Sequence, residues 1–477
     1  MTRIFFDVTD LRFYLTHAHR LSGIQRVTVM VIQQAAAALG KEAVHLSFLD
    51  NRTGHYLCLP YADLGTDDIA QPSTLSAALG VVPAEAGHRP TLRRYADRPV
   101  KRAFHSFVRD LNAAIGNTRH FEKRYTTIEA WKASRLAVRD TRTPAGTAFA
   151  DFFATAQAGD RLLLLDASWG DARAGTAHAR AHAEGIKVYS LIHDLIPIVT
   201  PEFVVGAQGV KFHNWLHGTL DYVDVYLANS NATAVDLRAF LATYGVNKPV
   251  SVVALAQEKK PVAQKEASAL PDALRPVDRD AYHRLYSGFF VDENVRALLK
   301  RPYVLCVGTM EARKNIWSIA HAWERMLRAG VPGLPRLVFA GRPGWLNADF
   351  DRLMNATGYL GGWVEILHGP SDDELDFLYR NCLFTIFASY KEGWGLPIGE
   401  SLSYGKTGVV SNCSSMPEVG GDMVEYCDPM SVNSIEKACM KLIGSPEHRA
   451  ALEARIAAAR LRTWRDVADE MIVAVKD

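Results

Sequence analysis

Short, continuous hydrophobic runs recur along the chain, and stretches with a helical pattern separate them. Each run ends at a polar residue or a glycine. Continuous rather than alternating hydrophobicity is typical of strands buried on both faces, and strands that alternate with helices predict parallel sheets in α/β layers. The runs that predict strands are Ile4–Phe6, Leu162–Leu165, Val188–Ile192, Val225–Ala228, Val304–Val307, Leu337–Ala340, Val364–Leu367, Leu383–Ala388 and Gly408–Ser411.

The two halves of the chain share this rhythm, which predicts two doubly wound domains. The stretch 257–300 lacks a sustained hydrophobic run and is rich in proline, so it is interpreted as a linker with a helical part near Asp292–Leu299. The first domain is then expected over 1–256 and the second over 301–460. In such sheets ligands bind beyond the carboxyl ends of the strands.

The run Gly54–Asp160 is long for a connection between two strands, and helical patterns at Val100–Ile115 and Thr127–Val138 lie within it. It is interpreted as a helical insertion in the first domain. From Arg89 to Arg142 it carries fourteen Lys and Arg against five Asp and Glu, although the whole chain has a net charge of only +2. Such a basic segment can meet an anionic membrane surface or an anionic substrate, or can be a solvated, arginine-rich helical region. The small net charge gives no case for nucleic acid.

Composition places the chain among globular enzymes. With 477 residues it is too long for one core, and its 48% hydrophobic and 22% charged residues are ordinary. No C-x-x-C pair occurs among the six cysteines, which predicts reduced, buried thiols in a cytoplasmic protein rather than disulfides or a zinc site. The N-terminus lacks a signal-peptide pattern, and no apolar run approaches the length of a membrane span.

Two carboxylates, Glu392 and Glu400, enclose a glycine-rich loop that follows a hydrophobic run and precedes a helical stretch. The start of a helix offers backbone N–H groups and a positive end to an anion, and carboxylates accept hydrogen bonds from sugar and ribose hydroxyls. A sugar nucleotide has this composition, because its phosphates lie between the hydroxyls of the sugar and those of the ribose. The loop residues expected to contact it are Gly393, Trp394, Gly395 and Leu396.

A second strand-to-helix turn begins at Gly308 and ends in the adjacent cations Arg313 and Lys314. Arginine brings a bidentate fork and lysine a point charge, so this turn can hold a diphosphate; a surface turn with ordinary charges is the alternative. In the first half, His193 ends a strand, where it can contact a sugar hydroxyl or a leaving phosphate. Gly23 lies at a helix entrance, where a phosphate can approach the backbone, although Ser22 beside it can equally be a plain helix cap.

These motifs together resemble the retaining glycosyltransferases of family four, which have the GT-B fold. The resemblance covers nearly the whole second half and is most specific at the E-x7-E pattern of Glu392 and Glu400. In the first half it rests on Ser22-Gly23 with Arg26 three residues later, on His193-Asp-Leu-Ile-Pro197 and on Asn229-Ser230. Trp394 stands where the family typically has phenylalanine.

The resemblance implies two Rossmann-like domains facing a cleft, with a final helix in 461–477 that crosses back to the first domain. It implies that Arg313 and Lys314 bind the diphosphate, that Glu392 binds sugar hydroxyls and that Glu400 binds the ribose. His193 would lie beside the transferred sugar. The leaving phosphate would be stabilised by cations and helix amides, so no metal and no cofactor beyond the nucleotide-sugar donor is expected.

The function expected is that of a retaining, metal-independent hexosyltransferase, with GDP-mannose or a deoxysugar nucleotide as favoured donor. Its acceptor would be a glycan or lipid-linked glycan in bacterial surface polysaccharide synthesis, including lipopolysaccharide. The expected location is the cytoplasm or the inner face of the plasma membrane. The alternatives are another GT-B enzyme, such as a sugar-nucleotide epimerase or phosphorylase, and a non-catalytic carbohydrate-binding protein.

Overall fold

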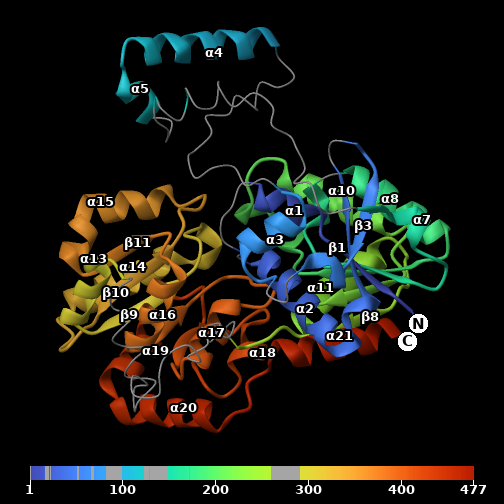
Figure 1. The fold of residues 1–477 in the computed structure, drawn as a ribbon. Coiled ribbons are helices and arrows are strands. Elements are labelled where there is room, and N and C mark those ends of the chain that lie inside the picture. Colours follow the sequence, from blue (N-terminus) through green and yellow to red (C-terminus); the bar gives the residue numbers. More distant parts are fainter. Residues whose placement is uncertain are drawn as a thin grey trace, which may run out of the picture.

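The structure is a computed structural model with two α/β domains, each built on one sheet (Figure 1). It describes residues 2–16, 21, 23–50, 53–65, 69–81, 99–122, 128, 131, 149–170, 172–258 and 291–476. The expected fold class, a GT-B arrangement of two doubly wound domains, is confirmed. Ser22, most of the basic segment Arg89–Arg142, most of the helical pattern Thr127–Val138 and most of the linker lie outside the described residues.

The first domain holds an eight-stranded sheet in the order β4-β3-β2-β1-β5-β6-β7-β8. The strands β2, β1, β5, β6, β7 and β8 are neighbours in that order and are parallel to one another. At the other edge, β3 runs antiparallel to β2, and β4 runs antiparallel to β3. The strands are β1 (Ile4–Asp7), β2 (Val44–Leu49), β3 (Tyr56–Pro60), β4 (Ala150–Asp151), β5 (Arg161–Leu164), β6 (Lys187–Ile192), β7 (Val225–Ala228) and β8 (Val250–Val252).

Helices separate most of these strands. They are α1 (Thr9–Leu15), α2 (Ile24–Leu39), α3 (Pro72–Ala78), α4 (Pro99–Ala114), α5 (Thr118–Glu122), α7 (Phe152–Thr155), α8 (Ala172–Ala183), α9 (Ile196–Val199), α10 (Gln208–Thr219) and α11 (Asn231–Thr243). The helix expected at Val100–Ile115 is confirmed as α4. The range Gly54–Asp160 is not wholly an insertion, however, because β3 and β4 inside it extend the sheet.

The second domain holds a six-stranded sheet, parallel at every pairing, in the order β11-β10-β9-β12-β13-β14. Its strands are β9 (Tyr303–Val307), β10 (Arg336–Gly341), β11 (Val364–His368), β12 (Thr385–Phe387), β13 (Gly408–Ser411) and β14 (Glu425–Cys427). Its helices are α13 (Glu293–Ala297), α14 (Ile316–Arg328), α15 (Ala348–Gly362), α16 (Asp372–Asn381), α17 (Leu396–Ser403), α18 (Met416–Gly420), α19 (Val432–Gly444) and α20 (Pro446–Ala458). The helical part expected near Asp292–Leu299 is confirmed as α13.

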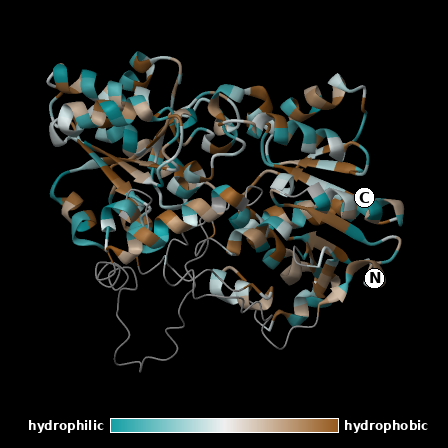
Figure 2. Ribbon diagram, turned by 90° about the horizontal axis from the view of Figure 1, so that it is seen from above, coloured by the Kyte–Doolittle hydropathy of each residue, from teal (hydrophilic) through white to brown (hydrophobic). Residues whose placement is uncertain are grey.

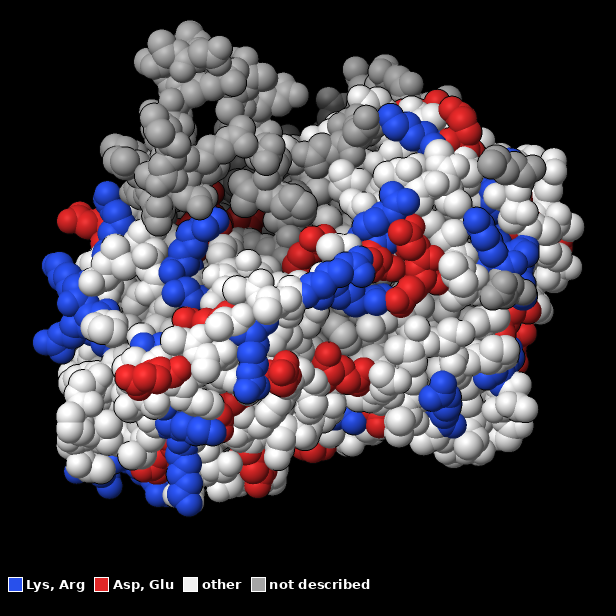
Figure 3. Space-filling model, turned by 90° about the horizontal axis from the view of Figure 1, so that it is seen from below, with Lys and Arg blue, Asp and Glu red and all other residues white. Residues whose placement is uncertain are grey.

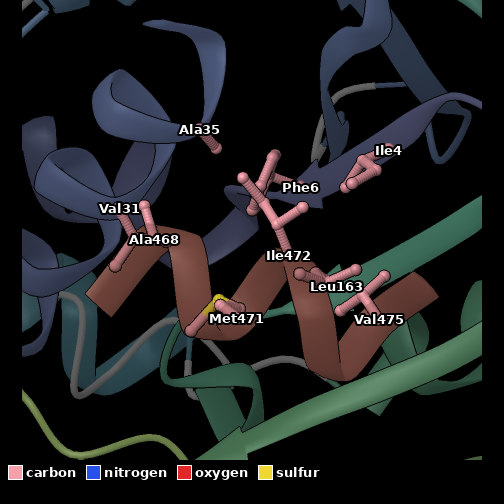
Figure 4. Close-up of a pocket in the computed structure, with 9 residues that line it drawn as sticks. All are labelled: Ile4, Phe6, Val31, Ala35, Leu163, Ala468, Met471, Ile472 and Val475. Atoms are coloured by element: carbon pink, nitrogen blue, oxygen red, sulfur yellow. The ribbon is translucent and has the colours of Figure 1, made fainter. Parts of the chain in front are cut away.

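The last helix, α21 (Trp464–Lys476), returns to the first domain and lies beside α2, as Figure 1 shows. Its apolar side chains face residues of β1, β5 and α2 (Figure 4). At its end the carbonyl of Val475 accepts hydrogen bonds from the Tyr189 hydroxyl at 3.0 Å and from Arg161 Nε at 3.2 Å. The apolar residues that meet between α21 and the first domain are Ile4, Phe6, Val31, Ala35, Leu163, Ala468, Met471, Ile472 and Val475.

Burial follows the layered plan. The strands of both sheets are coloured as hydrophobic in Figure 2, and the helices around them are mixed. One hydrophobic cluster runs through both domains and includes Leu255, Trp394 and Trp464. On the face drawn in Figure 3, basic and acidic side chains are interspersed. All six cysteines are free, and in the parts of the chain that are described no helix is long and apolar enough to cross a membrane.

Candidate functional site

The two motif loops of the second domain lie together at the carboxyl ends of β9 and β12. After β9 the chain passes Gly308 and forms a short 3-10 helix, Ala312–Lys314, before α14 begins. After β12 it passes the glycine-rich loop and enters α17. Because β9 and β12 are neighbours in a parallel sheet, their carboxyl ends place both turns at one edge.

Glu392 binds both predicted cations. Its Oε2 lies 2.8 Å from Arg313 Nη1, and its Oε1 lies 2.5 Å from Lys314 Nζ. Arg313 also contacts Glu311 Oε1 at 2.5 Å and donates to the carbonyl of Lys391 at 2.6 Å. Arg313 is thereby held in one position by two carboxylates and a carbonyl oxygen. The sequence predicted these residues at one site, but it did not predict that Glu392 would neutralise the cations.

The pKa values follow from this cluster. Burial disfavours the charged form of Glu392, but the positive charges of Arg313 and Lys314 outweigh burial and lower its pKa to about 2. Burial likewise acts to lower the pKa of Arg313, and the charges of Glu392 and Glu311 more than reverse this, so its pKa lies above the ordinary value. Glu392 and Arg313 therefore both stay ionised at neutral pH.

Serines on the segment after β13 hold the glycine-rich loop in place. Ser414 Oγ and Ser415 Oγ donate to the carbonyl of Glu392 at 2.7 and 3.0 Å, and Ser415 Oγ also donates to the carbonyl of Trp394 at 3.0 Å. Ser414 has a φ of 57°, a conformation that costs energy for a residue with a side chain. Sequence reasoning missed both serines, because a Ser-Ser pair after a strand is a common turn.

The glycine-rich loop touches the first domain directly. A Cβ on Gly393 would lie 1.9 Å from the carbonyl oxygen of His193, so no other residue fits there without moving one domain. Beside it, Trp394 is buried and its indole N–H donates to the carbonyl of Ala256 at 3.2 Å. Gly395 has a φ of 103° and forms the cap of α17, so Leu396 begins the helix. The loop is thus part of the contact between the domains.

His193 is buried at the end of β6, and its Nε2 lies 2.8 Å from the carbonyl oxygen of Leu165. A carbonyl oxygen only accepts, so Nε2 carries the hydrogen and the neutral ring offers Nδ1 as an acceptor. Burial lowers the pKa of His193 to about 4. In this structure His193 can therefore accept a hydrogen bond from a hydroxyl, whereas its one N–H is already used.

Glu400 is paired with a residue of the first domain. One carboxylate oxygen accepts from Arg26 of α2, and the other accepts from the Tyr379 hydroxyl at 3.0 Å. Burial alone would lower the pKa of Arg26, but the charge of Glu400 raises it above its ordinary value. Neither Arg26 nor Tyr379 was predicted as a site residue, although Arg26 stands in the motif that starts at Ser22-Gly23.

The two remaining glycines of the predicted site have positive φ angles. Gly23, at 54°, caps α2, and no heavy atom lies within 4 Å of the position of its missing Cβ. Gly308, at 146°, carries the alkyl chain of Lys314, whose Cε would lie 3.6 Å from a Cβ. Open space beside Gly23 is compatible with the close approach of a phosphate. At Gly308 the lysine chain would be in ordinary van der Waals contact with a Cβ, so the positive φ rather than a lack of space favours glycine there.

Several further contacts join the domains around this site. Glu418 accepts from the backbone N–H groups of Asn231 and Ala232 at 2.8 and 2.9 Å, so a carboxylate of one domain caps helix α11 of the other. Phe203 stacks on Tyr390 with ring centroids 5.4 Å apart. No signal in the sequence pointed to these partners of Glu418.

Among the residues that the structure describes, no group of three or more His, Cys, Asp or Glu side chains is placed to hold a metal ion. The positive charge at the site comes from Arg313 and Lys314, and the first turn of α17 adds backbone N–H groups. This set of donors can stabilise an anion that carries more than one negative charge.

Comparisons with known proteins agree with this geometry. Residues 291–458 match the sequence model of the family described as glycosyl transferases group 1. The chain is 33% identical over 175 residues to the O-antigen chain mannosyltransferase B of Escherichia coli, covering 36% of this chain and 45% of that protein. It is 23% identical over 261 residues to the serotype-specific mannosyltransferase WbdA of Escherichia coli, covering 54% of this chain and 29% of that protein. The chain thus spans less than half the length of these curated relatives.

Solved structures share the fold over the whole chain. HepE of Anabaena in complex with UDP has a TM-score of 0.55 at 11% identity and covers 100% of both chains. Sucrose-phosphate synthase of Thermosynechococcus elongatus has a TM-score of 0.55 at 14% identity and covers 100% of this chain and 98% of its own. The resemblance to bacterial glycosyltransferases of the mannosyltransferase kind, expected from the motifs, is therefore confirmed.

Proposed function

We propose that the chain is a retaining glycosyltransferase that works without a metal, which the match of residues 291–458 to the glycosyl transferases group 1 supports. Its donor is a nucleoside-diphosphate sugar, with GDP-mannose or a deoxysugar nucleotide favoured, and its acceptor is a glycan or a lipid-linked glycan. Two mannosyltransferases among its relatives support mannose. The product belongs to bacterial surface polysaccharide, including lipopolysaccharide, and the reaction takes place in the cytoplasm, at the inner face of the plasma membrane.

The observation that carries the proposal is the cluster of Glu392, Arg313 and Lys314. The two cations lie at the carboxyl ends of β9 and β12, where an open α/β sheet binds its ligand. A bound diphosphate takes over the cations, which frees Glu392 to accept from hydroxyls of the sugar. Glu392, a buried carboxylate, thus exchanges its two cations for sugar hydroxyls and is not left without partners.

The reaction is a substitution at the anomeric carbon. The bond from this carbon to the β-phosphate oxygen breaks, and its electron pair stays on the leaving diphosphate, where Arg313 and Lys314 stabilise the growing charge. The acceptor oxygen forms the new bond on the same face of the sugar, and its proton passes to the leaving phosphate. His193 accepts from a sugar hydroxyl through Nδ1 and thereby fixes the orientation of the ring.

The first experiment measures which nucleotide the protein binds. Thermal unfolding is followed with GDP, UDP, dTDP and CDP, with and without Mg²⁺. We expect one nucleotide to raise the unfolding temperature equally in both conditions. Stabilisation that requires Mg²⁺ would contradict the metal-independent site, and no stabilisation by any of the four would contradict the donor site.

The second experiment measures transfer from the donor that this panel selects. Replacing Lys314 by alanine should lower turnover by about 10²–10³-fold, the usual loss when one stabilising donor at a transition state is removed. Lys441→Ala is the matched control, because Lys441 is paired with Glu425 in an exposed salt bridge. Transfer to an acceptor with retained anomeric configuration supports the proposal. Interconversion of sugar nucleotides would indicate an epimerase instead, and phosphorolysis would indicate a phosphorylase. Binding without turnover would indicate a non-catalytic carbohydrate-binding protein.

A further inference from the structure

Helix α4 has an apolar stripe that points into solvent. Val100, Phe104, Phe107 and Leu111 follow one another at intervals of four, three and four residues, which places them on one face of the helix. Ile115 continues the stripe just beyond the helix end. These five side chains are between 50% and 82% exposed. So many large apolar groups on one exposed face mark a surface that binds something.

The stripe is not the side by which α4 packs onto its own small core. That core consists of Ala113, Phe121, Ile128 and Trp131. The opposite face of α4 holds it, because Asp110 accepts from the Trp131 indole at 2.8 Å and Arg109 lies over the same ring, 5.2 Å from its centre. With its inner face already anchored, α4 presents the stripe outward.

The position of α4 in the fold also suits an outward contact. Figure 1 draws α4 and α5 apart from both sheets, on the side of the molecule away from α21. The helix that carries the stripe therefore lies at an extremity of the described structure. A helix of 16 residues is about 24 Å long, so the contact is a line rather than a pocket.

The charge of the residues around α4 indicates which kind of partner the apolar stripe contacts. The segment Arg89–Arg142, to which α4 belongs, carries fourteen Lys and Arg against five Asp and Glu, whereas the rest of the chain is mildly acidic. Lys101 on α4 and Arg119 on α5 are exposed. An apolar stripe beside basic residues matches an interfacial membrane helix, whose apolar face enters the boundary between headgroups and acyl chains while cations meet anionic headgroups.

We propose that α4 docks the protein onto an anionic lipid surface, lying in the plane of the membrane with Phe104 and Phe107 at the centre of the inserted face. A second copy of the chain is a weaker fit, because two such segments would bring like charges together. The proposal deepens the membrane location given in the proposed function and rests on it only there; lipid binding is measured without donor or acceptor, so it can fail while the transfer reaction stands, and the reverse. The proposal assigns the contact with the lipid surface to the apolar stripe of α4.

The test is co-sedimentation of the full-length protein with vesicles of phosphatidylcholine, with and without phosphatidylglycerol. We expect binding to the anionic vesicles that weakens several-fold between about 0.05 M and about 0.5 M NaCl, because salt screens the exposed charges. The variant Phe104→Asp/Phe107→Asp should bind at least about tenfold more weakly, since it removes apolar area and adds negative charge. Lys101→Glu/Arg119→Glu should weaken binding to anionic vesicles only.

The matched control is Val210→Asp/Val473→Asp. Both valines are at least 60% exposed, on α10 and α21, so the charge change is the same and the helix face differs. The control should bind vesicles as the wild type does, and circular dichroism should show that all variants are folded. Equal binding by Phe104→Asp/Phe107→Asp and wild type would overturn the proposal. A second result would also overturn the proposal: neither the wild type nor Phe104→Asp/Phe107→Asp binds vesicles, and light scattering shows that the wild type self-associates and that only this variant does not.

Discussion

Arg26 and Glu400 form an ion pair across the boundary between the two domains. Arg26 lies in the first turn of α2, near Gly23, and Glu400 lies in α17, behind the glycine-rich loop. Tyr379 donates to the second oxygen of the same carboxylate. The resemblance to the family-four glycosyltransferases implies that Glu400 binds the ribose of the donor. The nucleotide would then meet a carboxylate whose position already depends on the other domain.

Replacing Arg26 by alanine should destabilise the protein. It leaves Glu400, which is largely buried, without its positive partner, and breaking such a pair costs up to about 3–5 kcal/mol. The free energy of unfolding, measured in urea for Arg26→Ala, Glu400→Gln and the double variant, gives the coupling between the two side chains. We expect a coupling of at least about 1 kcal/mol. Arg352→Ala is the control, because Arg352 and Asp349 are both well exposed, and its effect should stay within about 0.5 kcal/mol.

The Glu392 carboxylate should make the protein sensitive to acid. Its pKa of about 2 in the folded state lies below its ordinary value of 4.5, so it stabilises the fold above pH 4.5 and this contribution is lost as the pH falls towards 2. The contribution is at most about 3 kcal/mol. Unfolding in urea at pH 5 and pH 3 measures it. Glu392→Gln, which cannot titrate, should lose less stability over this interval than wild type; an equal loss would mean that Glu392 is not held by the two cations.

His193 should add a second dependence on pH in a separate window. Its folded pKa of about 4 lies below the ordinary value of 6.5, so the unfolded chain binds the extra proton between these values. Stability therefore rises as the pH increases from 4 to 6.5. His193→Gln keeps an N–H that can donate to Leu165 and does not titrate. Unfolding of the two proteins at pH 4.5 and pH 7 should show a smaller rise for the variant, and a parallel rise would contradict a buried, neutral His193.

Adding a methyl group at Gly393 should force the domains apart. The Cβ of Gly393→Ala would lie 1.9 Å from the carbonyl oxygen of His193, and strain of this kind typically costs about 1–3 kcal/mol. Hydrogen exchange should become faster at the stacked pair Phe203 and Tyr390, which spans the same boundary. Gly444→Ala is the control, because no heavy atom lies within 4 Å of its Cβ position and its φ is not in the left-handed region. Unchanged exchange in Gly393→Ala would show that the contact gives way locally.

The strands that were predicted are those whose residues are apolar without interruption. β7 and β13 lie at the predicted residues, and the other predicted strands differ from the runs by one or two residues at an end. β2 was missed because His45 and Ser47 interrupt its pattern, although both are buried. Their burial depends on the neighbouring strands β1 and β3, which a single segment of sequence does not reveal.

The site was predicted at the level of residues but not of partners. Arg313, Lys314 and Glu392 were assigned to one site from their motifs, yet their mutual pairing arises because two loops that are far apart in the chain meet at one sheet edge. Asn315, which caps α14, has a φ of 57° and donates to the carbonyls of Ala388 and Pro429 at 3.0 and 2.8 Å, so it ties three loops together. Such roles depend on tertiary structure and leave no periodic signal.

The return of α21 to the first domain has a consequence for the order in which the protein folds during translation. The ribosome completes the first domain long before it makes α21, yet Ile4, Phe6 and Leu163 of that domain are covered by Met471, Ile472 and Val475. At about 5–20 residues per second, the intervening stretch of roughly 200 residues takes on the order of 10–40 seconds to synthesise. During this interval the nascent first domain exposes the apolar strip that α21 later covers. Its final folding step therefore waits for residues that are synthesised after the whole second domain.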